Sequence, residues 1–112
     1  MSITTHVLDT SVGRPAKGIT ATLDIQVGDG WKELGKGVTN ADGRIATLLP
    51  TDHELQSGIY RLTFETASYF AENKLAAFYP SVPIHFEIID AKQHYHVPLL
   101  LNPFGYSTYR GS

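Results

Sequence analysis

Apolar and polar residues alternate along most of the chain, which is the period of a β-strand with one buried face. The clearest case is TATLDIQV at residues 20–27. The apolar positions of this stretch, which would share one face, are Ala21, Leu23, Ile25 and Val27. The turn sequence GDG follows at 28–30, and a second short strand begins after it. Residues 20–36 therefore predict a β-hairpin.

Three later segments, at 59–65, 82–88 and 94–101, alternate in the same way. Their predicted inward side chains are Tyr60, Leu62, Phe64, Val82, Ile84, Phe86, Ile88, Tyr95, Val97, Leu99 and Leu101. A first strand around His6 and an aromatic one at 106–109 are also expected, and NADG at 40–43 is a turn signal. Roughly seven or eight short strands at this spacing predict an all-β fold, a β-sandwich.

One stretch, at residues 66–78, departs from the period of two. Its helical positions are Ala67, Phe70, Ala71 and Phe78, with good helix formers between them. We expect a single short helix here, ended near YPSVP by Pro80 and Pro83.

Length and charge narrow the class of protein. The 112 residues fit one domain, 1–112, and the absence of cysteine excludes a disulfide scaffold. The net charge is −2 and the basic residues are scattered, so we expect neither nucleic acid nor membrane as a partner. The first residues lack the pattern of a signal peptide, which favours a cytoplasmic protein. A periplasmic chain whose leader has been removed would look the same.

Two histidines lie on the polar face of the strand predicted at 94–101. His94 and His96 oppose its apolar row, and the period alone favours two solvent-facing side chains. The H-x-H spacing also suits metal ligands on a strand, but the sequence nominates no third ligand. Pro98, on the same face, predicts an edge strand or a position without a ladder hydrogen bond.

The other candidate residues do not indicate catalysis or binding on their own. His6, Arg44 and Ser112 read as strand, turn and terminal residues, and no nucleophile elbow or phosphate loop is present. The aromatic strand at the chain end predicts a sheet edge that pairs with a second copy of the chain.

Four segments together resemble the transthyretin-like family over nearly the whole chain. They are HVLDTSVGRPA, TNADGR, YFAENKLAAFYPSVPIHFEI and HYHVPLLLNPFGYSTYRGS. The resemblance is closest to the enzymatic branch of the family, which hydrolyses 5-hydroxyisourate and carries the terminal Tyr-Arg-Gly-Ser. It implies a sandwich of two four-stranded antiparallel sheets with one short α-helix. It also implies a homotetramer, a dimer of dimers, with the sites at the interface between the dimers.

The resemblance also implies roles for particular residues. Its catalytic residues match His6, Arg44, His96 and Ser112. Its substrate-binding residues match Tyr109, Arg110 and Gly111. It implies no metal and no cofactor, and it assigns no role to His94.

The implied reaction is water attack on a ring carbonyl of 5-hydroxyisourate, which yields 2-oxo-4-hydroxy-4-carboxy-5-ureidoimidazoline in urate degradation. A neutral imidazole suits the base and a guanidinium suits the oxyanion. We expect His6 as the base and His96 as the group that orients water and substrate, with the reverse assignment left open. Two alternatives remain. One is a transthyretin-type carrier that binds a small ligand in the channel between subunits, and the other is a structural module without a site.

Overall fold

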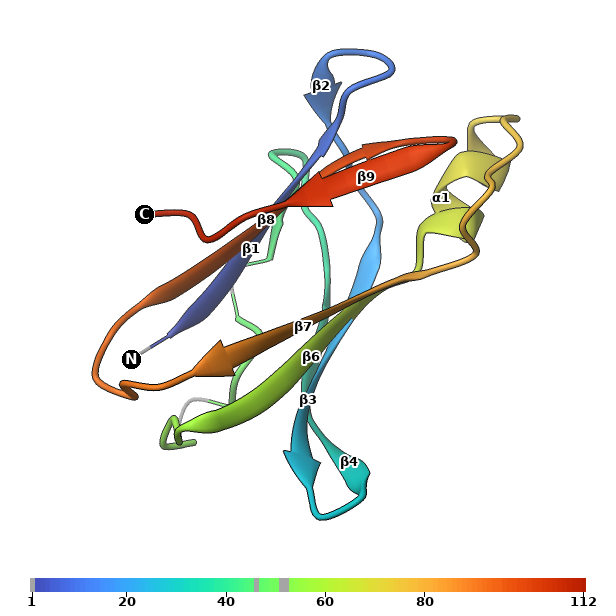
Figure 1. The fold of residues 1–112 in the computed structure, drawn as a ribbon. Coiled ribbons are helices and arrows are strands. Elements are labelled where there is room, and N and C mark those ends of the chain that lie inside the picture. Colours follow the sequence, from blue (N-terminus) through green and yellow to red (C-terminus); the bar gives the residue numbers. More distant parts are fainter. Residues whose placement is uncertain (1, 46, 51–52) are drawn as a thin grey trace.

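A computed structural model of the chain describes residues 2–45, 47–50 and 53–112. The described strands form two layers (Figure 1). One sheet has the order β2-β1-β8-β9, with β5 also paired to β1, and the other has the order β4-β3-β6-β7. The first sheet comprises β1 (Ile3–Asp9), β2 (Arg14–Pro15), β5 (Arg44–Ile45), β8 (Tyr95–Asn102) and β9 (Gly105–Thr108). The second comprises β3 (Thr20–Val27), β4 (Gly30–Val38), β6 (Gly58–Phe64) and β7 (Val82–Ile88). The predicted sandwich, its hairpin at 20–36 and its later strands are confirmed.

One pairing differs from the expected antiparallel sheets. β1 and β8 run parallel, with Ile3 opposite Tyr95 and Asp9 opposite Leu101, so the first sheet is mixed. β8 therefore lies between β1 and β9 (Figure 1). Pro98 is in this interior strand, and the edge-strand interpretation of that proline is wrong. A parallel pair requires a long crossover connection, which the whole second sheet provides here.

The core lies between the two layers and follows the predicted alternation. Tyr60, Leu62 and Phe64 of β6 and Leu99 of β8 are fully enclosed. Fully burying one such apolar side chain contributes roughly 1.5–3 kcal/mol, so a one-residue slip of β8 would cost several kcal/mol. This cost fixes which residues of β8 face outward, His96 among them.

The predicted helix is present but shorter than expected. α1 (Thr66–Glu72) ends before Lys74, which has a positive φ of 60°, and the Leu75 N–H turns back to donate to the Phe70 carbonyl at 2.9 Å. Phe78, which the helical spacing assigned to the buried face, is 70% exposed, so the expected extension to residue 78 is wrong. Of the helices in the described residues, none is long and apolar enough to span a membrane.

Candidate active site

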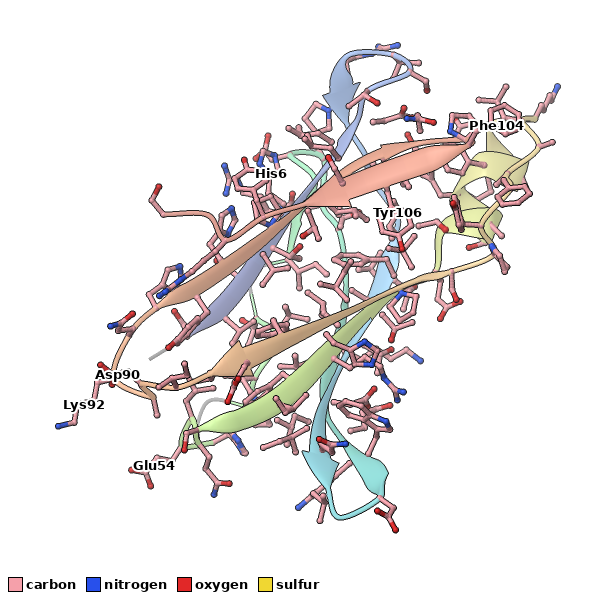
Figure 2. All side chains as sticks on the ribbon, in the orientation of Figure 1. His6, Glu54, Asp90, Lys92, Phe104 and Tyr106 are labelled. Carbon is pink, nitrogen blue, oxygen red and sulfur yellow. The ribbon has the colours of Figure 1, made fainter. Side chains whose placement is uncertain are left out.

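The outward face of the mixed sheet carries the candidate histidines. On β1, alternate side chains are buried, and Thr4, His6 and Leu8 are the half-buried ones between them. His96 is opposite Thr4 in the parallel register. It faces outward because its neighbours in the alternation, Val97 and Leu99, occupy the core. Figure 2 shows the His6 side chain on the side of β1 turned away from the second sheet. Strands from opposite ends of the chain thus bring the two histidines to one face.

Arg44 joins this face through the two-residue strand β5. In the antiparallel register Arg44 is opposite His6. The side-chain carbonyl of Asn40 accepts hydrogen bonds from the Asp42 and Arg44 N–H groups, at 2.9 and 3.1 Å. Gly43 has a φ of 74°, and a Cβ on it would overlap the Val7 carbonyl oxygen. The NADGR turn is therefore built to place Arg44 directly against β1.

The end of the chain returns to His96. The Gly111 N–H donates to the His96 carbonyl at 2.8 Å, which forms an isolated antiparallel bridge. A Cβ on Gly111 would overlap the Cδ2 atom of the His96 ring. The imidazole edge is therefore packed on the Cα of Gly111, which gives a steric reason for glycine at this position. Ser112 follows directly and is exposed.

Thr4 connects His96 to a second imidazole. The Thr4 hydroxyl is 2.8 Å from Nδ1 of His96 and 3.2 Å from Nε2 of His94. The Ser2 hydroxyl is 2.5 Å from Nδ1 of the same His94. Within the described residues no hydrogen bond involves Nε2 of His96, so that nitrogen is available to a substrate or a water molecule.

The electrostatic surroundings favour a neutral His96. Burial lowers the pKa of its imidazole below the usual value, and the charges of Arg44, His6 and His94 lower this pKa further. A hydrogen bond to the backbone of Thr4 raises the pKa but is the smallest effect. A neutral imidazole beside a fixed cation combines a general base with an anion-stabilising group.

The remaining predicted residues lie along the same chain end, but they do not all face the histidines. The Arg110 guanidinium stacks over the Tyr95 ring at 4.6 Å and donates to the Gln93 side chain at 2.7 Å. Tyr109 is 58% exposed. Both line a cavity of about 290 Å³ at the open edge between the layers, which His96 also borders. The structure thus gathers His6, Arg44, His96 and Gly111 on one face and turns Arg110 towards the neighbouring edge.

The metal-ligand interpretation of the H-x-H spacing gains no third ligand from the fold. No group of three or more His, Asp or Glu in residues 2–45, 47–50 and 53–112 is arranged to hold a metal ion.

Two positioning residues were missed by the sequence reasoning. Thr4 shares the outward face of β1 with His6, so the period of two could have identified it. Asn40 begins the NADG turn, where an Asn side chain commonly caps backbone N–H groups. The hydrogen bonds of His94 depend on the parallel pairing of β1 with β8, which nothing local in the sequence reveals.

Comparison with known proteins supports the expected family. The sequence model of the HIUase/Transthyretin family matches residues 3–111. A 5-hydroxyisourate hydrolase of Salmonella dublin is 44% identical over 110 residues, which cover 98% of this chain and 80% of that protein.

Solved structures agree with this assignment. The chain superposes on the 5-hydroxyisourate hydrolase of Klebsiella pneumoniae with a TM-score of 0.85 at 42% identity, covering 98% of both chains. Sea bream transthyretin, solved in complex with thyroxine, gives a TM-score of 0.90 at 30% identity and covers 97% of this chain and 93% of that one. The resemblance to the enzymatic branch is confirmed: this chain belongs to the HIUase/Transthyretin family.

Proposed function

We propose that this protein hydrolyses 5-hydroxyisourate in purine degradation, with its active site on the outward face of the mixed sheet. The observation that carries the proposal is the meeting of His6, Arg44 and His96 from three strands that are far apart in the sequence. Relatives at 44% and 42% identity that are named 5-hydroxyisourate hydrolase support the substrate.

In this proposal His96 is the general base. The lowered pKa of its imidazole suits it to take a proton from water near neutral pH, as does its Nε2, which has no partner among the described residues. This assignment reverses the preference for His6 drawn from the sequence. His6 then orients the water and the substrate. A general base of this kind contributes about 10²- to 10⁴-fold to a rate.

Arg44 stabilises the oxyanion that forms when water adds to the ring carbonyl. Its guanidinium stays charged at all relevant pH values and presents its donors in a planar fork. Removing one donor of this kind typically costs about 10²- to 10³-fold. The ring amide bond then breaks, and the leaving nitrogen takes the proton that His96 holds, giving the ureidoimidazoline product.

The chain end completes the site in this scheme. The Gly111 bridge fixes the direction of the terminal residues beside His96, where the Ser112 hydroxyl can position water. Tyr109 and Arg110 border the neighbouring cavity and would contact the rest of the substrate, or a residue of a second subunit. We include the homotetramer in the proposal, with each site at the interface between dimers.

A carrier of the transthyretin kind is the alternative, and the fold alone does not separate it from an enzyme. The superposition on sea bream transthyretin is as good as that on the hydrolase. The outward face, however, presents two imidazoles and a guanidinium, which suit a polar, reacting ligand better than an apolar one.

An assay coupled to uricase tests the proposal. Uricase generates 5-hydroxyisourate in solution, and its absorbance decay is followed with and without the protein. We expect a decay much faster than the spontaneous one, and a loss of about 10²-fold or more in His96→Gln and Arg44→Gln. Lys32→Gln, which neutralises an exposed cation on β4 of the second sheet, is the matched control for Arg44→Gln and keeps the wild-type rate. No acceleration by the wild-type protein would overturn the proposed function.

A further inference from the structure

A chain of four polar side chains leads from the proposed base to the protein surface. It runs from His96 to Thr4 at 2.8 Å, from Thr4 to His94 at 3.2 Å and from His94 to Ser2 at 2.5 Å. His96 is half-buried, whereas His94 and Ser2 are exposed. The role of His96 as the base rests on the proposed function, but this series of hydrogen bonds is a feature of the fold.

The hydroxyl of Thr4 has one proton and lies between two imidazole nitrogens. It can therefore donate to only one of them and must accept from the other. In one arrangement His96 donates from Nδ1, Thr4 donates to Nε2 of His94, and Nε2 of His96 keeps a free lone pair. In the other arrangement every bond is reversed, and Nε2 of His96 carries the proton. The direction in which the hydrogen bonds run therefore determines which nitrogen of His96 carries the proton.

We propose that Thr4 and His94 form a proton relay that lets His96 gain or lose a proton at Nε2 while it remains neutral. When Nε2 takes a proton from the attacking water, the Nδ1 proton of His96 passes to the Thr4 oxygen. The Thr4 hydroxyl proton passes in turn to Nε2 of His94. One proton enters the chain, no covalent bond to carbon changes, and the positive charge resides on His94.

The advantage of the relay is where it puts that charge. An imidazolium at His96 would be half-buried and close to Arg44 and His6, two groups whose charges oppose it. An imidazolium at His94 is exposed, and water or the Ser2 hydroxyl solvates it. When Nε2 of His96 gives its proton to the leaving ring nitrogen, the relay runs backwards: His94 returns a proton to Thr4, and Thr4 returns its own to Nδ1 of His96. Thr4 and His94 are positioning residues in this scheme, since neither touches the substrate.

The alternative is that these hydrogen bonds only hold the two strands together. The relay needs the Thr4 hydroxyl, whereas strand pairing needs only a β-branched or small side chain at this position. Thr4→Val removes the hydroxyl and keeps the shape, and Thr4→Ser keeps the hydroxyl. Thr22→Val is the matched control, because Thr22 is a half-buried threonine in β3 with no side-chain hydrogen bond among the described residues.

Kinetics and NMR test the relay together. We expect Thr4→Val to lower kcat on 5-hydroxyisourate about tenfold to a hundredfold with KM little changed, and Thr4→Ser to restore most of kcat. In ¹⁵N-histidine spectra at neutral pH, wild-type His96 should show averaged Nδ1 and Nε2 shifts from two exchanging tautomers. Thr4→Val should show one tautomer, and Thr22→Val should match the wild type. Assignment of His96 comes from the signal missing in His96→Gln.

Several results would overturn the relay. They are a wild-type kcat in Thr4→Val, a loss in Thr4→Val that Thr4→Ser does not restore, or identical His96 spectra in Thr4→Val and the wild type. The NMR comparison requires no substrate, so it decides the relay independently of the assay. Failure of the protein to hydrolyse 5-hydroxyisourate would overturn the proposed function and leave the spectroscopic result standing.

Discussion

The chain end can pack against His96, the proposed base, only because Gly111 has no Cβ. Any Cβ at position 111 overlaps the imidazole, so Gly111→Ala must rotate the ring or detach the terminus. Displacing a reacting group by about 1 Å can cost about 10²-fold in rate. We expect a loss of that order in kcat/KM, with a nearly unchanged melting temperature because the terminus contributes little to the core.

Gly105→Ala is the matched control for this prediction. A Cβ there meets the Asn102 side chain at ordinary contact distance, 3.7 Å, and should leave the rate unchanged. Full activity in Gly111→Ala would show that the terminus does not set the position of His96.

The low pKa of His96 predicts a dependence of stability on pH. Below the usual histidine pKa of about 6.5, the unfolded chain binds a proton that folded His96 resists. The free energy of unfolding should therefore fall as the pH drops from about 6.5 through the folded-state pKa. His96→Gln removes this contribution, so its stability should fall less steeply over that range in urea unfolding experiments. His85→Gln is the control, and parallel curves for His96→Gln and the wild type would contradict the low pKa.

At the scale of residues, the sequence could identify the candidates but not their arrangement. The period of two placed His94 and His96 on the polar face of one strand, and only the resemblance separated His96 from its neighbour. Neither approach revealed that Thr4 connects the two, because that contact spans 92 positions of the chain.

The turn at Asn40–Arg44 is the element that positions Arg44, the proposed oxyanion stabiliser. Asn40→Ala leaves the N–H groups of Asp42 and Arg44 without their side-chain acceptor. Each lost hydrogen bond costs about 1 kcal/mol, and the guanidinium loses its fixed position opposite His6. We expect kcat to fall about tenfold or more in the uricase-coupled assay, with a modest loss in urea stability.

Asn40→Asp is the informative partner of that variant. It retains a side-chain oxygen as the acceptor and should keep most of the activity. Equal losses in both variants would show that the amide acts in some way other than by capping the turn.

Among the elements, strands were predicted better than the helix. Each buried strand has its own alternating pattern. The end of α1, in contrast, is determined by the turn at Lys74 and by a contact with a segment distant in sequence. The Phe78 N–H donates to the Pro103 carbonyl at 2.8 Å, so a neighbouring hairpin, and not local helix propensity, decides where residues 73–78 go.

At the scale of the molecule, the two sheets each have an open edge strand, β9 and β7, on the side where the cavity lies. Aromatic side chains gather at one end of this side: Tyr79 packs against Phe78 at 5.0 Å and against Tyr106 at 5.3 Å. Figure 2 places Phe104, which is 72% exposed, at the tip of the adjoining β8–β9 hairpin. Exposed aromatic groups beside open edges are typical of surfaces that pair with another chain.

Light scattering tests the proposed homotetramer. We expect the mass of four chains for the wild type, and smaller species with lower specific activity for Tyr106→Lys. Val27→Lys, at the exposed far hairpin, is the control and should remain tetrameric. A single-chain mass for the fully active wild type would contradict a site shared between subunits.

The whole-molecule architecture was predictable as a sandwich, yet the strand order was not. Local patterns determine which residues are buried in each strand, but they do not determine which strand lies beside which. The parallel pair of β1 and β8 follows from the route of the chain around both layers, which only the complete fold defines.

That parallel pair also determines when the proposed site can form during synthesis of the protein. Until β8 leaves the ribosome, β1 lacks its principal neighbour, and contacts this distant in sequence form slowly because a long loop must close first. Thr4 and His96 then meet in the same step that completes the sheet. A partly made or C-terminally truncated chain therefore has an unpaired sheet edge at β1 and lacks the proposed catalytic face, so we expect it to be inactive until the last strands insert.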